Sequence, residues 1–273
     1  MIQRYDINNA PLDVCVAAEF TFLDGFSKDK LVNRVLPELF GPDIDRNDPK
    51  RNTHLAAFAQ VLGLQLKLSI MVGESVLYTF SRDSEIVGVA IYKLPIHQRP
   101  KLSRWQRLKL QTVCVRAGLE TIFLALKTGL RPRSREIEDF FKNFLGSGKT
   151  SEQDAAYRKR LAHFSYEELK EQEYLYKDTV CLDILAVVQK AQGTGCGTAL
   201  LKQGLMDFKG EGPLFKDGDV EVRGPPKFSL IPSLGKEPYY VRFGFKTMTE
   251  RSVNFPYDGL VFVAKHMEKL ADE

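Results

Sequence analysis

The chain has no long apolar run. No stretch approaches the roughly 20 consecutive apolar residues that a helix needs to cross a bilayer. The opening residues, Met1 to Asp6, also lack the basic segment followed by an apolar segment that marks a secretory signal. We therefore expect a cytoplasmic protein with no stable membrane association.

Cysteine and histidine are scarce as well. The 273 residues include four cysteines, at positions 15, 114, 181 and 196, and four histidines, at positions 54, 97, 163 and 266. The cysteines form no CxxC pair and the histidines have no ligand spacing, so the sequence indicates neither a disulfide scaffold nor a metal site. The net charge is only +4 and no recognised motif accompanies it, so we expect no nucleic-acid binding.

Glycine, by contrast, is concentrated where an apolar strand pattern meets a helical one. Leu182 to Leu201 reads LDILAVVQKAQGTGCGTALL, and apolar residues continue at helical spacing after the glycines. Gly193, Gly195 and Gly197 leave no Cβ between the backbone and a ligand. The first N–H groups of a helix have no partner within it and lie at the positive end of its dipole. The segment therefore predicts a pyrophosphate site.

Two other phosphate loops match this chain less well. A Walker loop requires GxxxxGK(S/T), but the Gly-Lys-Thr at 148 to 150 has Asn143 in place of the first glycine and no strand before it. We interpret that tripeptide as part of a linker. A dinucleotide fingerprint requires GxGxxG or GxGxxA, and here Thr198 takes the last position. Asp217 and Asp219 stand near the distance expected of a ribose-binding acid, so a dinucleotide site stays open as an alternative.

Gln192 to Gly197 matches the Arg/Gln-x-x-Gly-x-Gly/Ala signature at every fixed position and resembles the GCN5-related N-acetyltransferases (GNATs), an acetyl-CoA-dependent superfamily. Glu237 to Phe245 is similar to that family's second landmark, a Pro-Phe-Tyr-x-Arg-x-Gly-Phe run. The resemblance implies acetyl-CoA as cosubstrate and no metal. It assigns cofactor binding to the strand end Leu185, Ala186 and Val187, to the loop Gln192, Gly193, Thr194, Gly195, Cys196, Gly197 and Thr198, and to Ser233, where the family often has asparagine.

The same resemblance implies direct transfer, in which a neutral amine attacks the thioester carbonyl and the thiolate leaves. Such a reaction requires a base, backbone donors for the oxyanion and an acid near the sulfur. Tyr240 matches the family's tyrosine near the sulfur and is the expected acid, and the backbone of Leu185 to Val187 is the expected oxyanion donor. Asp183, the nearest carboxylate, is the candidate base. A base elsewhere that acts through water is an equal alternative.

The remaining patterns predict an α+β (mixed α/β) fold. A strand over Ile2 to Asp6, a helix over Pro11 to Phe22, a helical stripe over Leu55 to Leu66 and a hairpin over Val76 to Leu94 match the front half of a GNAT. About 80 residues then precede the central strand, far beyond ordinary loop lengths, so we expect a helical insertion over about 95–177. We predict one domain, residues 1–273, with a mixed, partly splayed central sheet flanked by helices. This order resembles puromycin N-acetyltransferase and related small-molecule acetyltransferases.

The expected helical insertion also affects which acceptor and which other partners we expect. Because a large helical insertion should narrow the acceptor site, we expect a small-molecule amine; a protein lysine or N-terminus, and a module that binds acyl-CoA without transferring the acyl group, are alternatives. From Arg99 to Arg135 there are ten Lys or Arg residues and one acid, Glu120, a pattern typical of a solvated face or of a surface that meets anions. The run from Tyr257 to Lys265 predicts a terminal strand that can pair with a second copy in a homodimer.

Overall fold

The computed structural model describes residues 1–7, 9–27, 49–95, 179–208, 214–217, 220–223, 227–233, 235–254 and 261–270, and isolated positions between 104 and 115. Along the chain the elements are β1 (Ile2–Tyr5), α1 (Leu12–Gly25), α3 (Pro49–Met71), β2 (Ser75–Arg82), β3 (Glu85–Lys93), β4 (Val180–Val187), the 3-10 turn η2 (Gln189–Ala191), α8 (Cys196–Asp207), β5 (Leu214–Asp217), β6 (Val220–Arg223), β7 (Lys227–Leu230), α9 (Glu237–Val241), β8 (Lys246–Asn254) and β9 (Val261–Leu270).

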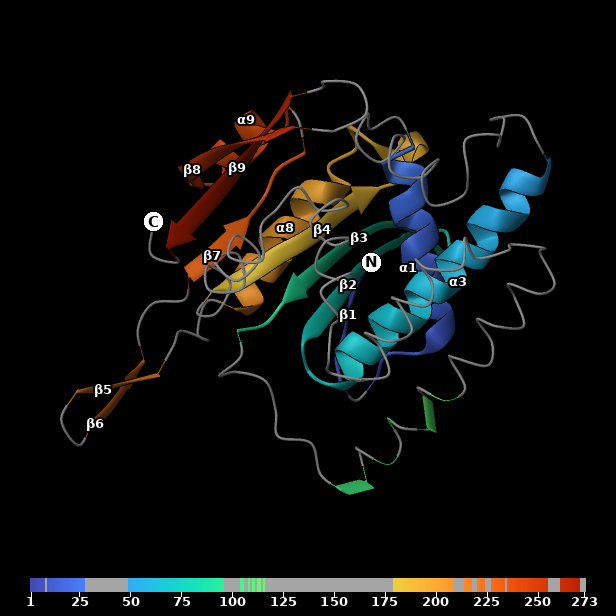
Figure 1. Cartoon of the computed structure of the whole chain (residues 1–273), viewed down its shortest axis with the longest axis horizontal. Coiled ribbons are helices and arrows are strands. Elements are labelled where there is room, and N and C mark those ends of the chain that lie inside the picture. Colours follow the sequence, from blue (N-terminus) through green and yellow to red (C-terminus); the bar gives the residue numbers. More distant parts are fainter. Residues whose placement is uncertain are drawn as a thin grey trace, which may run out of the picture.

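The main sheet is mixed, with seven strands in the order β1-β2-β3-β4-β7-β9-β8, and Figure 1 shows it running across the molecule. Every neighbouring pair is antiparallel except β4 and β7, which run parallel. Strands β5 and β6 form a separate two-stranded hairpin. The expected mixed α/β fold class, with an open mixed sheet and flanking helices, is confirmed.

The predicted hairpin over Val76 to Leu94 is present as β2 and β3. Arg82 and Glu85 are the last paired residues, so Asp83 and Ser84 alone make the turn. Both have positive φ, 51° and 66°, which is the conformation that a two-residue turn of matching twist requires. The short polar turn therefore sets the register of the two strands.

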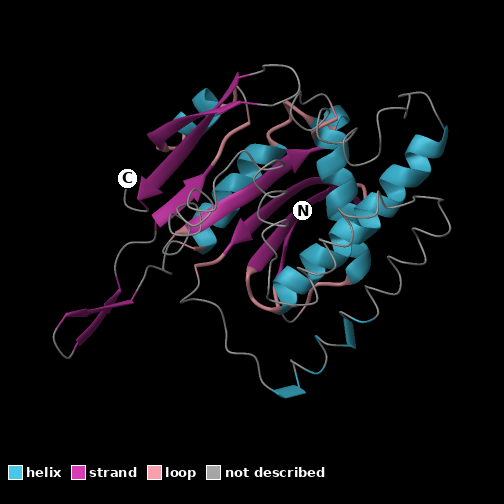
Figure 2. Ribbon diagram, in the orientation of Figure 1, coloured by secondary structure: helices cyan, strands magenta, loops and turns pink. Residues whose placement is uncertain are grey.

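Side chains alternate between the two faces of this hairpin, and each face is buried against helices, as Figure 2 shows. One face packs on α8, with Tyr78, Ala90 and Tyr92 against Leu200, Leu201 and Phe208. The other face packs on α1 and α3, with Leu77, Val89 and Ile91 against Cys15, Ala18, Leu66 and Ile70. The sheet is thus a middle layer with helices on both sides.

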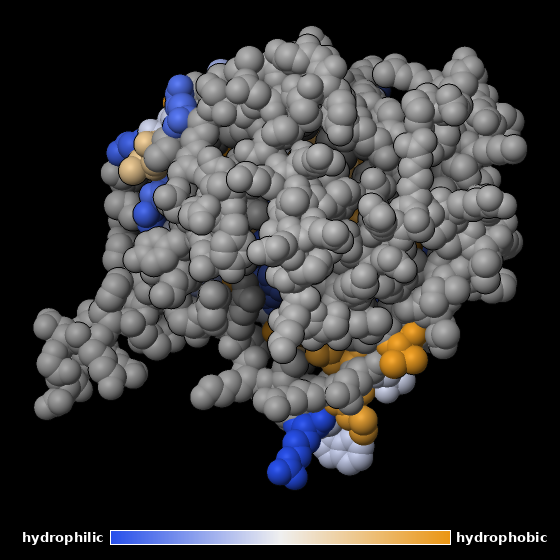
Figure 3. All heavy atoms as spheres, in the orientation of Figure 1, coloured by the Kyte–Doolittle hydropathy of each residue, from blue (hydrophilic) through white to orange (hydrophobic). Residues whose placement is uncertain are grey.

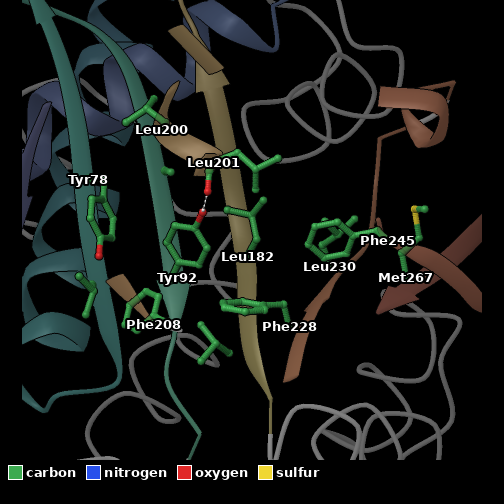
Figure 4. Packing of buried hydrophobic residues seen from close by; sticks show 13 residues of the cluster. Tyr78, Tyr92, Leu182, Leu200, Leu201, Phe208, Phe228, Leu230, Phe245 and Met267 are labelled. Carbon is green, nitrogen blue, oxygen red and sulfur yellow. Dashed lines mark hydrogen bonds between the residues drawn. The ribbon is translucent and has the colours of Figure 1, made fainter. Parts of the chain in front are cut away.

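Close packing fixes the position of α8 on its face of the sheet. The rings of Tyr78 and Tyr92 lie 5.6 Å apart edge-to-face, and the Tyr92 hydroxyl donates a hydrogen bond to the Leu201 carbonyl at 3.4 Å (Figure 4). Gly204 lies directly over Tyr92, where an added Cβ would come within 2.3 Å of the tyrosine ring. Because α8 cannot shift without breaking these contacts, the loop before it is held at a fixed height above the sheet.

One expectation about the terminal strand needs correction, and others concern residues that the structure does not describe. The terminal strand is β9, and it lies inside the sheet between β7 and β8, so it is not the edge strand that pairing with a second copy was expected to use. The edge strands of the main sheet are β1 and β8. The part of the expected helical insertion beyond residue 115 lies outside the described residues. The homodimer and the single-domain boundary stay predictions.

Candidate functional site

Strands β4 and β7 pair over only three residues and then separate. Their last pair is Leu182 with Leu230, whereas β4 continues to Val187 while still paired with β3. Figure 1 accordingly shows β7 beside the start of β4 only. The second half of β4 therefore has one edge that no described strand covers.

The backbone groups on this edge can be assigned from the ladder. Val188 N–H donates to the Val87 carbonyl at 2.9 Å, so this donor faces β3. Backbone groups alternate in direction along an antiparallel strand, and those of Val187 and Leu185 therefore point away from β3, towards the uncovered edge. Ala186 points its backbone groups to β3 and its side chain into the core under α1. The expected oxyanion donors thus reduce to the N–H groups of Leu185 and Val187.

A β-bulge marks the point where the two strands part. Ile91 pairs with Ile184 and Tyr92 with Leu182, which leaves Asp183 as an extra residue in β4. The extra residue puts Leu182 and Leu185 on the same face of the sheet, although they are three positions apart. Asp183 and Ile184 consequently both face α1. This places a carboxylate at the start of the uncovered edge.

The glycine loop leads from β4 into α8. Gly193 and Gly195 have φ values of +78° and +86°, a region that favours glycine, and a Cβ at either position would meet nothing within 4 Å. Gly195 is the N-cap of α8 and no side chain of the described residues caps that helix. Its first intrahelical bond runs from Ala199 N–H to the Gly195 carbonyl at 2.9 Å, so the N–H groups before Ala199 have no acceptor within the helix.

The loop is attached to the C-terminal end of α1. The Gln192 side chain donates to the carbonyls of Gly25 and Val187, at 3.2 and 3.1 Å, and so points away from the helix N-terminus. Asp24 accepts a hydrogen bond from Gln189 N–H at 2.7 Å. Gly25 lies against the Val187 backbone so closely that an added Cβ would come within 2.8 Å of the Val187 carbonyl oxygen. Gln192 therefore braces the loop, a role that the sequence motif alone does not reveal.

Residues in the loop just before α8 and in its first turn differ in their surroundings. Thr194 Oγ1 donates to the Ala191 carbonyl at 2.7 Å and lies 3.1 Å from the buried Cys196 thiol. Gly197 would accept a Cβ at ordinary contact distances of 3.5 Å or more, which fits the Gly/Ala position of the motif. Thr198 Oγ1 lies 3.4 Å from the Tyr239 hydroxyl. Cys196 thus has a structural role, because its thiol is turned inward.

The two tyrosines of α9 differ in placement. Tyr240, the expected acid, stacks edge-to-face against the buried Phe245, with ring centroids 6.1 Å apart, and burial raises its pKa. Tyr239 instead reaches the first turn of α8 through its hydroxyl, and burial raises its pKa as well. Ser233 lies between β7 and α9, and its carbonyl accepts from Lys236 N–H at 2.9 Å. The structure therefore brings Tyr239, which the motif did not single out, next to the loop.

The carboxylate expected as base, Asp183, has a cationic partner. Lys93 Nζ lies 3.1 Å from Asp183 Oδ2, and both side chains are partly exposed, at 44% and 38%. Burial lowers the pKa of Lys93, but the charge of Asp183, the hydrogen bond to it and smaller contributions from Cys181 and Glu74 together raise that pKa overall. A second carboxylate, Glu19 of α1, is buried close to Asp183, and sequence reasoning missed it. Burial, with a smaller contribution from the Asp183 charge, raises the pKa of Glu19 to about 7.

Metal ligands do not gather in the part of the chain that the structure describes, where no group of three or more His, Cys, Asp or Glu side chains occurs. No helix among the described residues combines the length and the apolar character needed to span a bilayer.

The described positions of the basic insertion are helical, and Trp105, Leu108 and Val115 are exposed. Figure 3 shows apolar atoms gathered at the lower edge of this view of the surface.

Comparison with known proteins gives matches among solved structures alone. No family model and no curated protein matches the chain. A Corynebacterium glutamicum protein named histone acetyltransferase HPA2 and related acetyltransferase is similar, with a TM-score of 0.45, 16% identity, and coverage of 98% of this chain and 95% of that one. For a GCN5-related N-acetyltransferase from Rhodopseudomonas palustris the TM-score is 0.41 and the identity 10%, with coverage of 99% of this chain and 94% of that one. For an acyl-CoA N-acyltransferase from Pseudomonas aeruginosa the TM-score is 0.45 and the identity 11%, with coverage of 98% of both chains.

The solved neighbours include GNAT acetyltransferases. This is the superfamily that the glycine loop and the tyrosine-containing run resemble. At these identities the neighbours' substrates are not carried over to this chain.

Proposed function

We propose that the protein is an acetyl-CoA-dependent N-acetyltransferase of the GNAT superfamily that transfers an acetyl group directly to a primary amine. The observation that supports this most is the succession of two features along the chain: the uncovered edge of β4 is followed, after the short turn η2, by a glycine-lined helix N-terminus that no side chain of the described residues caps. The first feature suits an extended amide-containing arm, and the second suits a pyrophosphate.

The loop residues fit a diphosphate group. Gly193 and Gly195 have open space where side chains would stand, so a phosphate can approach the backbone closely. The N–H groups of Cys196, Gly197 and Thr198 are the first donors of α8, and the helix dipole adds to their attraction for an anion. These donors would hold the phosphates, while the side chain of Gln192 keeps the loop in place from behind.

The uncovered edge fits the arm and the acyl group. From the phosphate site the edge runs back along β4 towards Asp183, so an arm that pairs with Leu185 and Val187 ends near the bulge. When bound there, acetyl-CoA supplies the activated acyl carbon. The N–H of Leu185 or Val187 would donate to the developing oxyanion, a contribution of about 3 kcal/mol in comparable sites. Tyr240 stays the proposed proton donor to the thiolate, with Tyr239 as the alternative that lies closer to the loop.

For the acceptor we propose a small-molecule primary amine, because a long segment between β3 and β4 would narrow the acceptor site, and this segment rejoins the sheet at Val180, shortly before the uncovered edge begins. A protein lysine or N-terminus is the second possibility. A third, from another class, is a module that binds acyl-CoA without turnover. We propose a cytoplasmic location.

The test is a calorimetric titration of the purified chain with acetyl-CoA, with NAD as the competing ligand. Gly195→Glu should lower acetyl-CoA affinity by about 100-fold, because it disturbs two charge-assisted hydrogen bonds worth about 1.5 kcal/mol each. Met206→Glu is the matched control, since Met206 is exposed at the far end of the same helix and receives the same added charge. The Met206→Glu variant should bind acetyl-CoA with the affinity of the wild type.

Either of two results would reject the proposed site: binding of NAD in place of acetyl-CoA, or equal affinities for wild type and Gly195→Glu. If acetyl-CoA binds but no amine in a panel of benzylamine, tyramine, spermidine and a lysine-containing peptide releases thiol, the chain is a binding module. Turnover of the peptide without turnover of the small amines would assign a protein acceptor.

A further inference from the structure

Glu19 occupies an unusual place on α1. Cys15, Ala18 and Phe22 form the stripe by which this helix packs on the sheet, and Glu19 stands inside that stripe with 5% of its surface exposed. Buried carboxyl groups are ordinarily paired, because removing an unpaired charge from water is unfavourable. A carboxyl group in this position therefore needs an explanation beyond packing.

No partner for Glu19 is found among the residues that the structure describes, neither a hydrogen bond nor an ion pair. Asp183, the carboxylate whose charge acts on Glu19, is itself paired with Lys93 at 3.1 Å. The other charges near this part of α1, Asp13 on the same helix and Lys67 on α3, act on Cys15. The Glu19 carboxyl is thus buried, has no partner among the described residues, and lies near enough to Asp183, the extra residue of the β4 bulge, to be influenced by its charge.

The bulge is also where the proposed thioester would lie. Asp183 is the first residue beyond the last β4–β7 pair, at the start of the uncovered edge. The C-terminal end of α1 is attached to the other end of the same edge, where Gly25 contacts Val187. Residues of α1 on either side of Glu19, Ala18 and Phe22, pack in the same cluster as Ile184 and Ala186 of β4, so Glu19 lies on the part of the helix that is docked on this half of the strand.

We infer that Glu19 is the general base that accepts the proton of the acceptor ammonium, with Asp183 and Lys93 as a positioning pair beside it. This inference rests on the proposed acetyltransferase function. The Glu19 carboxylate takes a proton from R–NH3⁺ and leaves a neutral amine. The amine nitrogen then forms a bond to the acetyl carbon, the carbon–sulfur bond breaks, and the thiolate receives a proton as the amide loses one.

Burial suits Glu19 to this role. A base works best when its pKa lies close to the working pH, and burial next to Asp183 brings the pKa of Glu19 to about 7. Asp183 differs because Lys93 already neutralises it. Of these two neighbouring carboxyl groups, Glu19 is therefore the one suited to take up a proton near neutral pH.

The activity test compares Glu19→Gln with Asp13→Asn, which removes an exposed carboxylate from the same helix. The measured quantity is thiol release from acetyl-CoA with the best amine of the panel, as kcat/KM against pH. Glu19→Gln should lower kcat/KM by about 100-fold or more and remove the inflection near pH 7, with acetyl-CoA affinity unchanged within about twofold. Asp13→Asn should leave the profile unchanged. Asp183→Asn should move the inflection to lower pH, because a neighbouring negative charge is lost.

A second readout does not depend on turnover. In protein labelled with ¹³C at the glutamate carboxyl carbons, one signal should titrate near pH 7 and be absent from Glu19→Gln. If no such signal exists, the inference is wrong. If Glu19→Gln keeps the wild-type pH profile while Asp183→Asn abolishes activity, the inference is also wrong and Asp183 is the base. Failure of acetyl-CoA to bind the wild type would instead reject the proposed function, and the inference with it.

Discussion

The buried carboxyl of Glu19 should make the chain less stable as pH rises. Its pKa is about 7 in the folded protein, against an ordinary value of 4.5. Between these two values the folded state binds more protons than the unfolded state, so the stability that the protonated group allows is lost as pH rises through 7. The two pKa values differ by about 2.5 units, and each pKa unit corresponds to about 1.4 kcal/mol, so the unfolding free energy should fall by about 3 kcal/mol.

Glu19→Gln removes this dependence, because glutamine resembles the protonated carboxyl in shape and carries no charge. The variant should match wild type near pH 4.5 and exceed its unfolding free energy by about 3 kcal/mol at pH 8. Urea unfolding followed by circular dichroism at several pH values measures this difference. Asp13→Asn should give a difference that is flat with pH. A flat difference for Glu19→Gln as well would show that Glu19 is not buried with a raised pKa.

Two further comparisons test the site and its support. Tyr240→Phe should lower turnover by about 10- to 100-fold with acetyl-CoA affinity intact, whereas Tyr239→Phe should weaken acetyl-CoA affinity by about two- to tenfold, the worth of one hydrogen bond. Calorimetry and steady-state rates on both variants decide this, and the reverse pattern would exchange the two roles. Gly25→Ala should destabilise the fold by about 1–3 kcal/mol, because the new Cβ meets the Val187 backbone, which cannot move aside. Gly197→Ala, where only ordinary contacts arise, is the control, and equal urea midpoints for the two variants would contradict the close α1–β4 contact.

The β2–β3 hairpin and the glycine loop could be predicted from the sequence, because neighbouring residues alone determine their conformation. The β2–β3 hairpin follows from period-2 apolar residues on either side of a short polar turn, and its turn residues do have positive φ. The glycine loop follows from the need for positive φ before a helix, and Gly193 and Gly195 meet that need. The position of β9 inside the sheet could not be predicted, because strand order depends on pairings far apart in the sequence.

The parts of the site that sequence reasoning missed depend on tertiary packing. The bulge at Asp183 comes from how β4 registers with β3, and the acid itself gives no signal of it. Glu19 is buried because its helix docks on the sheet, although one signal was available: it follows Cys15 by four residues and precedes Phe22 by three, which puts it on the apolar face. The bracing role of Gln192 needs the end of α1 beside the loop, which only the fold supplies.

The long segment between β3 and β4 leaves and rejoins the sheet at adjacent positions, since Lys93 pairs with Cys181. For the sheet, this segment is the connection of an ordinary antiparallel hairpin, whatever its length. Doubling the length of such a connection adds only about 0.6 kcal/mol of closure entropy. Neither the glycine loop nor Glu19 belongs to this segment. Segments of different size and sequence can therefore be grafted between these two residues, so the acceptor preference that we propose this segment to set can diverge or be engineered while the proposed donor site and the proposed base stay unchanged.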